Sequence, residues 1–181
     1  MTSFKYYVGA SVDGFIADGS ADAHWFTTFA KQPGVKKHFD QFFETIGAVV
    51  IGGKTYEGIA KEVADGNMSW MFAHLPVWVL THHELPTLPD TDLTFIRGEI
   101  GFWSQDIARS AGAGDVWVAG GADLAGGFVQ ANVLDELLLV TVPVVFGEGT
   151  SIFGRSVRAQ LSAMSVEDLG NDITLTRYAV G

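Results

Sequence analysis

Two pairs of adjacent glycines stand where an apolar run gives way to a helix-like run. Gly52–Gly53 is followed directly by Lys54–Thr55, and Gly120–Gly121 is followed by Ala122–Leu124. Glycine lets the backbone turn sharply and lets a ligand approach where a Cβ would collide. The first turn of the helix behind each pair presents unpaired N–H groups and the positive end of the helix dipole. Either pair alone is explained by a tight turn, but two pairs in one chain favour a phosphate-binding site.

A third strand end carries Thr81, His82 and His83. Ligands of open α/β sheets bind at the carboxyl ends of the strands, so this segment belongs with the two glycine pairs. Lys54, His82 and His83 are the candidates for holding negative charge. Neither a Walker loop nor a usual dinucleotide fingerprint is present, because Gly112–Gly114 precedes its strand instead of following it. Neighbouring histidines in an extended segment point in opposite directions, so we expect no metal ion.

The elements that must position these residues follow from the apolar patterns. Apolar runs predict strands, and apolar residues at helical spacing predict helices. The expected strands cover 4–10, 48–51, 77–81, 93–96, 116–119, 134–146 with an interruption at Pro143, and 173–180. The expected helices cover 35–46, 55–63, 102–111 and 124–131, and residues 11–23 are expected to form a loop. This alternation predicts one three-layer αβα domain over residues 1–181, with a mostly parallel sheet and antiparallel C-terminal strands.

Composition narrows the classes of protein. The 181 residues are 48% hydrophobic, contain no cysteine and carry a net charge of −10, which opposes general nucleic-acid binding. No apolar run reaches the roughly 18 residues of a membrane span, and the first residues lack a signal-peptide pattern. We therefore expect a cytoplasmic protein with a small-molecule substrate and neither nucleic acid nor membrane as a partner.

Four segments, in this order, resemble motifs of the dihydrofolate reductase-like superfamily. Ser11–Ala17 resembles its S-x-D-G-x-I-A signature, Ile51–Glu57 its M-G-R-x-T-Y-E junction, and Val118–Leu124 its second G-G-x-x-L junction. Val133–Gly149 resembles the V-D-E-L…P-V-x-x-G-x-G stretch of the family. The nearest branch is the reductase domain of bacterial riboflavin biosynthesis.

This resemblance implies a reductase that transfers hydride from NADPH, with NADH as an alternative, to a small pyrimidine- or pteridine-like heterocycle. The reaction would be similar to that of 5-amino-6-(5-phosphoribosylamino)uracil reductase. The resemblance also implies that Ala10, Asp13 and Ile16 lie beside the nicotinamide. The other cofactor residues that it implies are Gly52, Gly53, Lys54, Thr55, Thr81, His82, Gly120, Gly121, Ala122, Asp123 and Leu124.

Gly53 departs from the family pattern, which usually has an arginine there that contacts the extra phosphate of NADPH. Lys54, helped by His82 or His83, is the candidate to replace it. Lysine is a mobile point charge without the bidentate fork of arginine, so NADH or a flavin-type cofactor stays open as an alternative.

Asp13 is the candidate proton donor, although Asp–Gly is also ordinary turn chemistry. Folate reductases use a carboxylate on the helix after the first loop, where this chain offers Asp40 and Glu44. For Asp40 we expect solvent exposure. The protein is therefore alternatively a paralogue that binds a dinucleotide without catalysis, or a true dihydrofolate reductase.

Two apolar features concern the substrate and the assembly. Trp25 and the apolar residues of 68–72 are expected to pack in the core or to line the substrate site. The long apolar strand 137–146 would be hazardous as an exposed edge, and relatives in the family pair through this part of the chain. We therefore expect a homodimer.

Overall fold

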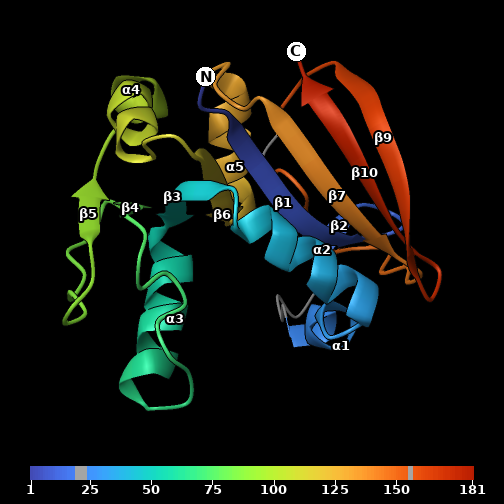
Figure 1. Ribbon diagram of the computed structural model, residues 1–181, viewed down its shortest axis with the longest axis horizontal. Helices are drawn as coiled ribbons and strands as arrows, with labels where there is room; N and C mark the ends of the chain where they lie inside the picture. The colour runs from blue at the N-terminus through green and yellow to red at the C-terminus, as the bar shows by residue number, and fades with distance from the viewer. Residues whose placement is uncertain (19–23, 155–156) are drawn as a thin grey trace.

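The computed structural model describes residues 1–18, 24–154 and 157–181. In the described part of the chain, eight strands form one sheet in the order β5-β4-β3-β6-β1-β7-β10-β9 (Figure 1). Neighbouring strands from β5 to β7 are parallel, whereas β10 is antiparallel to both β7 and β9. The strands are β1 (Phe4–Ser11), β3 (Ile46–Gly52), β4 (Val77–Leu80), β5 (Leu93–Ile96), β6 (Asp115–Gly120), β7 (Glu136–Val142), β9 (Leu161–Gly170) and β10 (Ile173–Val180). The short strands β2 (Phe15–Ala17) and β8 (Thr150–Ser151) pair with each other.

Helices cover both faces of this sheet. The main ones are α2 (Pro33–Phe43), α3 (Gly53–Ala64), α4 (Ile100–Ser110) and α5 (Ala122–Gln130), with a short η1 (His24–Phe26) and α1 (Thr27–Ala30) before α2. Helices α2 and α3 pack on one face, where Val49 and Ile51 of β3 point, and α4 and α5 pack on the other, with Ala48 and Val50. Successive strand residues point to opposite faces, so an all-apolar strand such as β3 is buried on both. The predicted three-layer αβα fold is confirmed.

The C-terminal part of the sheet corrects the sequence-based prediction. The strand expected over 134–146 is β7, which ends at Val142, before Pro143. It lies between β1 and β10 inside the sheet, so it is not an exposed edge. The edge strand on this side of the sheet is β9, which was not predicted because most of its side chains are exposed and leave no regular apolar pattern. The expectation that this strand is an exposed edge is therefore wrong, and the homodimer stays a prediction.

Smaller differences concern the ends of elements. Strand β2 interrupts the segment expected to be a loop, and residues 19–23 of that segment lie outside the described residues. Helix α2 begins at Pro33, because proline is well suited to the first turn of a helix. Helix α3 begins at Gly53 itself, directly after β3, so no residue separates the strand from the helix.

Ion pairs link neighbouring strands at the end of the sheet where β1, β6 and β7 begin. Lys5 Nζ lies 2.6 Å from Asp115 Oδ2, and Arg177 Nη2 of β10 lies 2.8 Å from Glu136 Oε2. Lys5 is also paired in register with Glu136, so alternating charges cross the four neighbouring strands β6, β1, β7 and β10. The glycine pairs lie at the opposite end of the sheet, where the parallel strands finish. No helix within the described residues is both long and apolar enough to cross a membrane.

Candidate functional site

The two glycine pairs lie side by side because β3 and β6 are parallel neighbours in the sheet. A Cβ built on Gly52 would lie 3.7 Å from the backbone nitrogen of Gly121. Thr55, from the first turn of α3, faces the second pair, with its Oγ1 3.7 Å from a Cβ built on Gly120. Gly120 has a φ of +132°, which residues with a side chain rarely adopt. The peptide bond between Gly120 and Gly121 is cis. The fold therefore joins the two junctions into one structure.

Two helices begin at these junctions. Gly52 is the N-cap residue of α3 and Gly121 that of α5, and within the described residues neither has a side-chain cap hydrogen bond. The first N–H groups of both helices lack partners inside the helix, and both dipoles place partial positive charge at the same edge of the sheet. The loop that follows β8 crosses the start of α5, since a Cβ on Gly154 would lie 2.7 Å from the Asp123 nitrogen. This arrangement suits an anionic ligand.

A cavity of about 1310 Å³ opens at the C-terminal ends of the parallel strands, beside the two glycine pairs. Its walls come from the starts of α3, α4 and α5 and from the segment after β4. The sequence-predicted cofactor residues that line it are Gly52, Gly53, Lys54, Thr55, Thr81, His82, Gly121, Ala122, Asp123 and Leu124. Ala10, Ile16 and Gly120 are not among its lining residues, and the contacts of Ala10 and Ile16 with a nicotinamide stay predictions. His83 also lines the cavity.

Sequence reasoning missed part of this wall. Gly98–Gly101, at the start of α4, line the cavity together with Glu57 of α3 and Thr150 of β8. Gly98 and Glu99 follow the apolar strand β5, so a third strand–glycine–helix junction was the signal that would have found them. Gly127, Gln130 and Ala131 belong to the far end of α5, and only the packing of that helix brings them to the wall.

Thr81 and Gly53 fix the position of β4 against α3. Thr81 is 6% exposed, and its Oγ1 accepts a hydrogen bond of 3.0 Å from the backbone N–H of His83. A Cβ on Gly53 would lie 2.8 Å from that same Oγ1 and 3.0 Å from the Thr81 Cβ. The close approach leaves no room for a side chain at position 53.

Asp13 connects two loops of the protein. Its carboxylate accepts hydrogen bonds from the Ser11 hydroxyl at 2.6 Å, from the Gly147 N–H at 2.7 Å and from the Phe146 N–H at 3.2 Å. The Ser11 hydroxyl, followed by the Gly147 and Phe146 N–H groups, holds the pKa of the Asp13 carboxyl below its usual range. An ionised carboxylate accepts hydrogen bonds but has no proton to donate. These contacts favour the turn role of Asp13, and its catalytic role stays a prediction.

Helix α2 carries no buried acid in its described residues. Its buried side chains are Val35 and Phe42. Asp40 is exposed, as expected, and pairs with Lys36 one turn before it at 2.5 Å. Glu44, just after the helix, is also exposed. The buried carboxylate that folate reductases place on this helix is therefore missing from α2. Among the described residues, no group of three or more His, Cys, Asp or Glu is placed to hold a metal ion.

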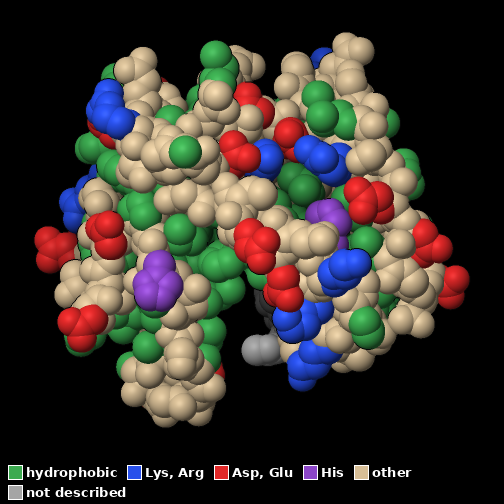
Figure 2. All heavy atoms as spheres, in the orientation of Figure 1, with side chains coloured by type: hydrophobic (Ala, Val, Ile, Leu, Met, Phe, Trp, Pro, Cys, Tyr) green, Lys and Arg blue, Asp and Glu red, His purple; other side chains and the backbone are tan. Residues whose placement is uncertain are grey.

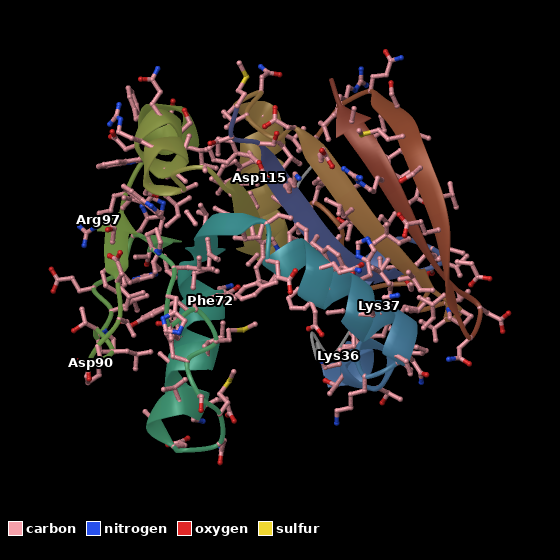
Figure 3. All side chains as sticks on the ribbon, in the orientation of Figure 1. Lys36, Lys37, Phe72, Asp90, Arg97 and Asp115 are labelled. Atoms are coloured by element: carbon pink, nitrogen blue, oxygen red, sulfur yellow. The ribbon has the colours of Figure 1, made fainter. Side chains whose placement is uncertain are left out.

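Aromatic residues gather on the α2–α3 side of the sheet. Trp25 donates to the Ile16 carbonyl at 2.8 Å and packs edge-on against Phe146, with ring centroids 4.9 Å apart. The Phe26 ring covers Gly9, where a Cβ would lie 2.1 Å from it. A hollow separates α3 from the α1–α2 segment (Figure 2), and Phe72 lies between these elements (Figure 3). Phe72 is 2% exposed and packs against Trp70, so these two belong to the core, while Met68 and Met71 are exposed.

The comparisons with known proteins agree with this architecture. The model of the RibD C-terminal domain matches residues 5–175, so the chain belongs to the RibD C-terminal domain family. The uncharacterised protein YwjB of Bacillus subtilis is 27% identical over 150 residues, which are 81% of this chain and 80% of YwjB.

Solved structures with the same fold were also found. A Shewanella sp. PV-4 protein, provisionally named for riboflavin biosynthesis, has a TM-score of 0.80 at 21% identity, covering 99% of both chains. A Thermotoga maritima deaminase/5-amino-6-(5-phosphoribosylamino)uracil reductase has a TM-score of 0.69 at 18% identity, over 99% of this chain and 57% of that longer one. Dihydrofolate reductase from Enterococcus faecalis, solved with NADP(H), has a TM-score of 0.62 at 16% identity, over 99% and 96% of the two chains. The resemblance to the dihydrofolate reductase-like superfamily is thus confirmed for the fold.

Proposed function

We propose that this protein is a reductase that transfers hydride from a nicotinamide dinucleotide to a small pyrimidine- or pteridine-like heterocycle. The observation that carries this proposal is the convergence of the two glycine junctions, with two helix N-termini, on one cavity of about 1310 Å³. Small-molecule pockets usually measure about 300–1,000 Å³, so this cavity has room for an extended ligand such as a dinucleotide.

The residues at the junctions fit the phosphates of such a cofactor. Side chains are missing where Gly52 and Gly121 approach each other, and the N–H groups of α3 and α5 lack side-chain caps there within the described residues. Lys54 would contribute positive charge and Thr55 a hydroxyl. A bound reduced nicotinamide supplies the hydride, which leaves this chain to bind, orient and exclude water. Membership in a family that includes riboflavin-pathway reductase domains supports the same reading.

The contacts of Asp13 point to a positioning role. By accepting hydrogen bonds from Gly147 and Phe146, the carboxylate ties the loop after β1 to the loop after β7. We propose that it holds the loop against the nicotinamide, and that the proton that accompanies the hydride comes from solvent.

Binding of NADH and NADPH tests the proposal directly. The protein has five tryptophans, among them Trp117 on β6, so quenching of tryptophan fluorescence can follow the titration. We expect at least one cofactor to bind below about 1 mM, which corresponds to roughly 4 kcal/mol. Lys54→Ala should weaken binding, whereas Lys61→Ala, on the same helix but outside the cavity wall, should not. If neither cofactor binds below about 1 mM, the reductase proposal is wrong.

Turnover separates the proposed enzyme from its alternative, a paralogue that binds a dinucleotide without catalysis. The missing buried acid on α2 and the occupied carboxylate of Asp13 are the observations that favour this alternative. Oxidation of the reduced cofactor in the presence of pyrimidine ribityl compounds or dihydrofolate distinguishes the two. The absence of a buried carboxylate on α2 makes dihydrofolate the poorer substrate of the two classes.

We also propose a homodimer, now through β9 and not through β7. Strand β9 is ten residues long and forms the edge of the sheet, so its outer backbone groups are available for pairing. It exposes Leu161, Met164 and Val166, whose side chains are 39%, 54% and 68% accessible. A second copy that pairs with this strand would satisfy its outer backbone groups and cover its exposed apolar side chains.

A further inference from the structure

The cavity wall carries more acidic than basic side chains. Among the described residues that line it, Lys54 is the one Lys or Arg, while Glu57, Glu99 and Asp123 contribute carboxylates. Glu57 lies one helical turn after Lys54 on α3, and Glu99 is the N-cap residue of α4. Both glutamates are exposed, and neither forms an ion pair with a described residue. Their charges are therefore free to act on a ligand.

The wall also has no place for a further cation where α3 begins. A Cβ on Gly53 would lie 2.8 Å from Thr81 Oγ1, so the contact with β4 excludes a side chain at this position. Arg97 directly precedes the lining residue Gly98, but it lies beside β5 at the outer margin of the molecule (Figure 3) and does not line the cavity. Neither position places a guanidinium in the cavity wall.

Thr81 uses its hydroxyl within its own segment. It is buried, and its hydroxyl oxygen accepts the N–H of His83 at 3.0 Å. The same hydroxyl donates to the His83 carbonyl at 3.4 Å. Beside Thr81, the segment after β4 contributes His82 and His83 to the wall.

We infer that this cavity selects NADH over NADPH, and that Glu57 and Glu99 are the residues that set the preference. The inference rests on the proposed function. A phosphate monoester adds about −1.5 to −2 charges at neutral pH, and carboxylates of the same cavity wall repel it, an effect that salt screens with a Debye length of about 8 Å. A free ribose 2′-hydroxyl instead donates a hydrogen bond to a carboxylate, which is how acidic residues favour NADH in other dinucleotide sites. Three carboxylates against one lysine in the wall favour the ligand without the extra phosphate.

The test compares the dissociation constants of NADH and NADPH, followed by tryptophan fluorescence, in the full chain and in three variants. We expect the native protein to bind NADH about tenfold more tightly than NADPH, a ratio that moves toward one as added salt screens the charges. Glu57→Gln and Glu99→Gln keep a carbonyl acceptor for the 2′-hydroxyl but remove the charge. Each should strengthen NADPH binding several-fold and change NADH binding little. Asp65→Asn, at the far end of α3, is the matched control and should change neither.

The outcomes separate this inference from the proposed function. Tighter binding of NADPH than of NADH by the native protein would overturn the inference and leave the reductase proposal standing. A native preference for NADH that both glutamine variants leave unchanged would overturn the assignment to Glu57 and Glu99. Failure of both cofactors to bind would overturn the proposed function itself.

Discussion

Gly53 and Thr81 touch where the start of α3 meets the end of β4, and both line the cavity. The contact shows why one residue type is required at a position that a sequence pattern assigns only to a turn. The space beside the Gly53 Cα is filled by a buried hydroxyl that itself holds the backbone of His83. A single methyl group there would displace β4, α3 or both.

Gly53→Ala should therefore destabilise the fold by about 1–2 kcal/mol and weaken dinucleotide binding, because its Cβ would lie within 3.0 Å of Thr81. Gly58→Ala, in the same helix, is the control: nothing lies within 4 Å of its Cβ. The control should stabilise the protein by about 0.5–1 kcal/mol, since alanine is the better helix former. Urea unfolding measures both. Equal stability of the two variants would contradict the packing argument.

Asp13→Asn distinguishes a positioning carboxylate from a proton donor. The amide keeps one acceptor oxygen but places an NH₂ group against N–H donors, so the loops at Phe146 and Gly147 should loosen. Hydrogen exchange of these two amides should accelerate, and turnover should fall by about tenfold or less with an unchanged pH profile. Loss of a general acid would instead cost about 10²–10⁴-fold and would remove one limb of the pH profile.

Helix α2 packs a titratable side chain, His38, against the sheet. His38 faces the sheet, and its Nδ1 lies 3.2 Å from the Tyr7 hydroxyl of β1. Burial holds the pKa of His38 below its ordinary value of 6.5, with Glu167 of β9 acting in the opposite direction and Arg177 of β10 in the same one. Gly34 brings the start of this helix against β9, since a Cβ there would lie 1.9 Å from the Leu169 carbonyl oxygen.

Stability should therefore fall in mild acid. Because the folded pKa of His38 is lowered, the unfolded chain binds more protons, and stability rises with pH across the window just below 6.5. The contribution is complete above 6.5 and is lost as the pH falls toward the folded value. His38→Gln should flatten the pH dependence of the urea midpoint between about pH 5 and pH 8. Exposed His74→Gln should leave it unchanged, and an unaltered slope in His38→Gln would contradict the role of burial.

At the scale of the whole molecule, the two edge strands of the sheet, β5 and β9, differ. On the β5 side the parallel strands are short, and the glycine junctions and the cavity lie near them. On the other side β9 is the longest strand within the described residues and carries exposed apolar side chains. Long apolar edge strands are usually covered in stable proteins.

Val166→Glu should convert the proposed homodimer into a monomer, because it places a charge at the most accessible of the three exposed large apolar side chains of β9. Light scattering after size exclusion should give twice the 19.4 kDa of one chain for the native protein and the single mass for the variant. Val145→Glu, equally exposed but in the loop after β7, is the matched control and should stay dimeric. A native protein that runs as a monomer at micromolar concentration would contradict the proposal.

The sequence by itself predicted the elements that are buried on both faces, because burial leaves a local apolar pattern. It also predicted the two glycine junctions, which the residue type itself indicates, and a mostly parallel sheet, but not that β3 and β6 are neighbours in it. It did not predict β9, whose strand structure depends on hydrogen bonds to β10 and whose exposed side chains follow no pattern. The same holds for the start of α4 in the cavity wall, which lies beside the glycine pairs only after folding.

Tertiary structure alone decided which groups Asp13 and Gly53 contact. Asp13 finds its partners 133 and 134 positions away along the chain, and Gly53 meets Thr81 because β3 and β4 pair in the sheet. Such contacts depend on which strands become neighbours, which no local pattern of residues records. The sequence thus determined what kind of site this protein can build, and the fold decided which side chains have room and charge to act in it.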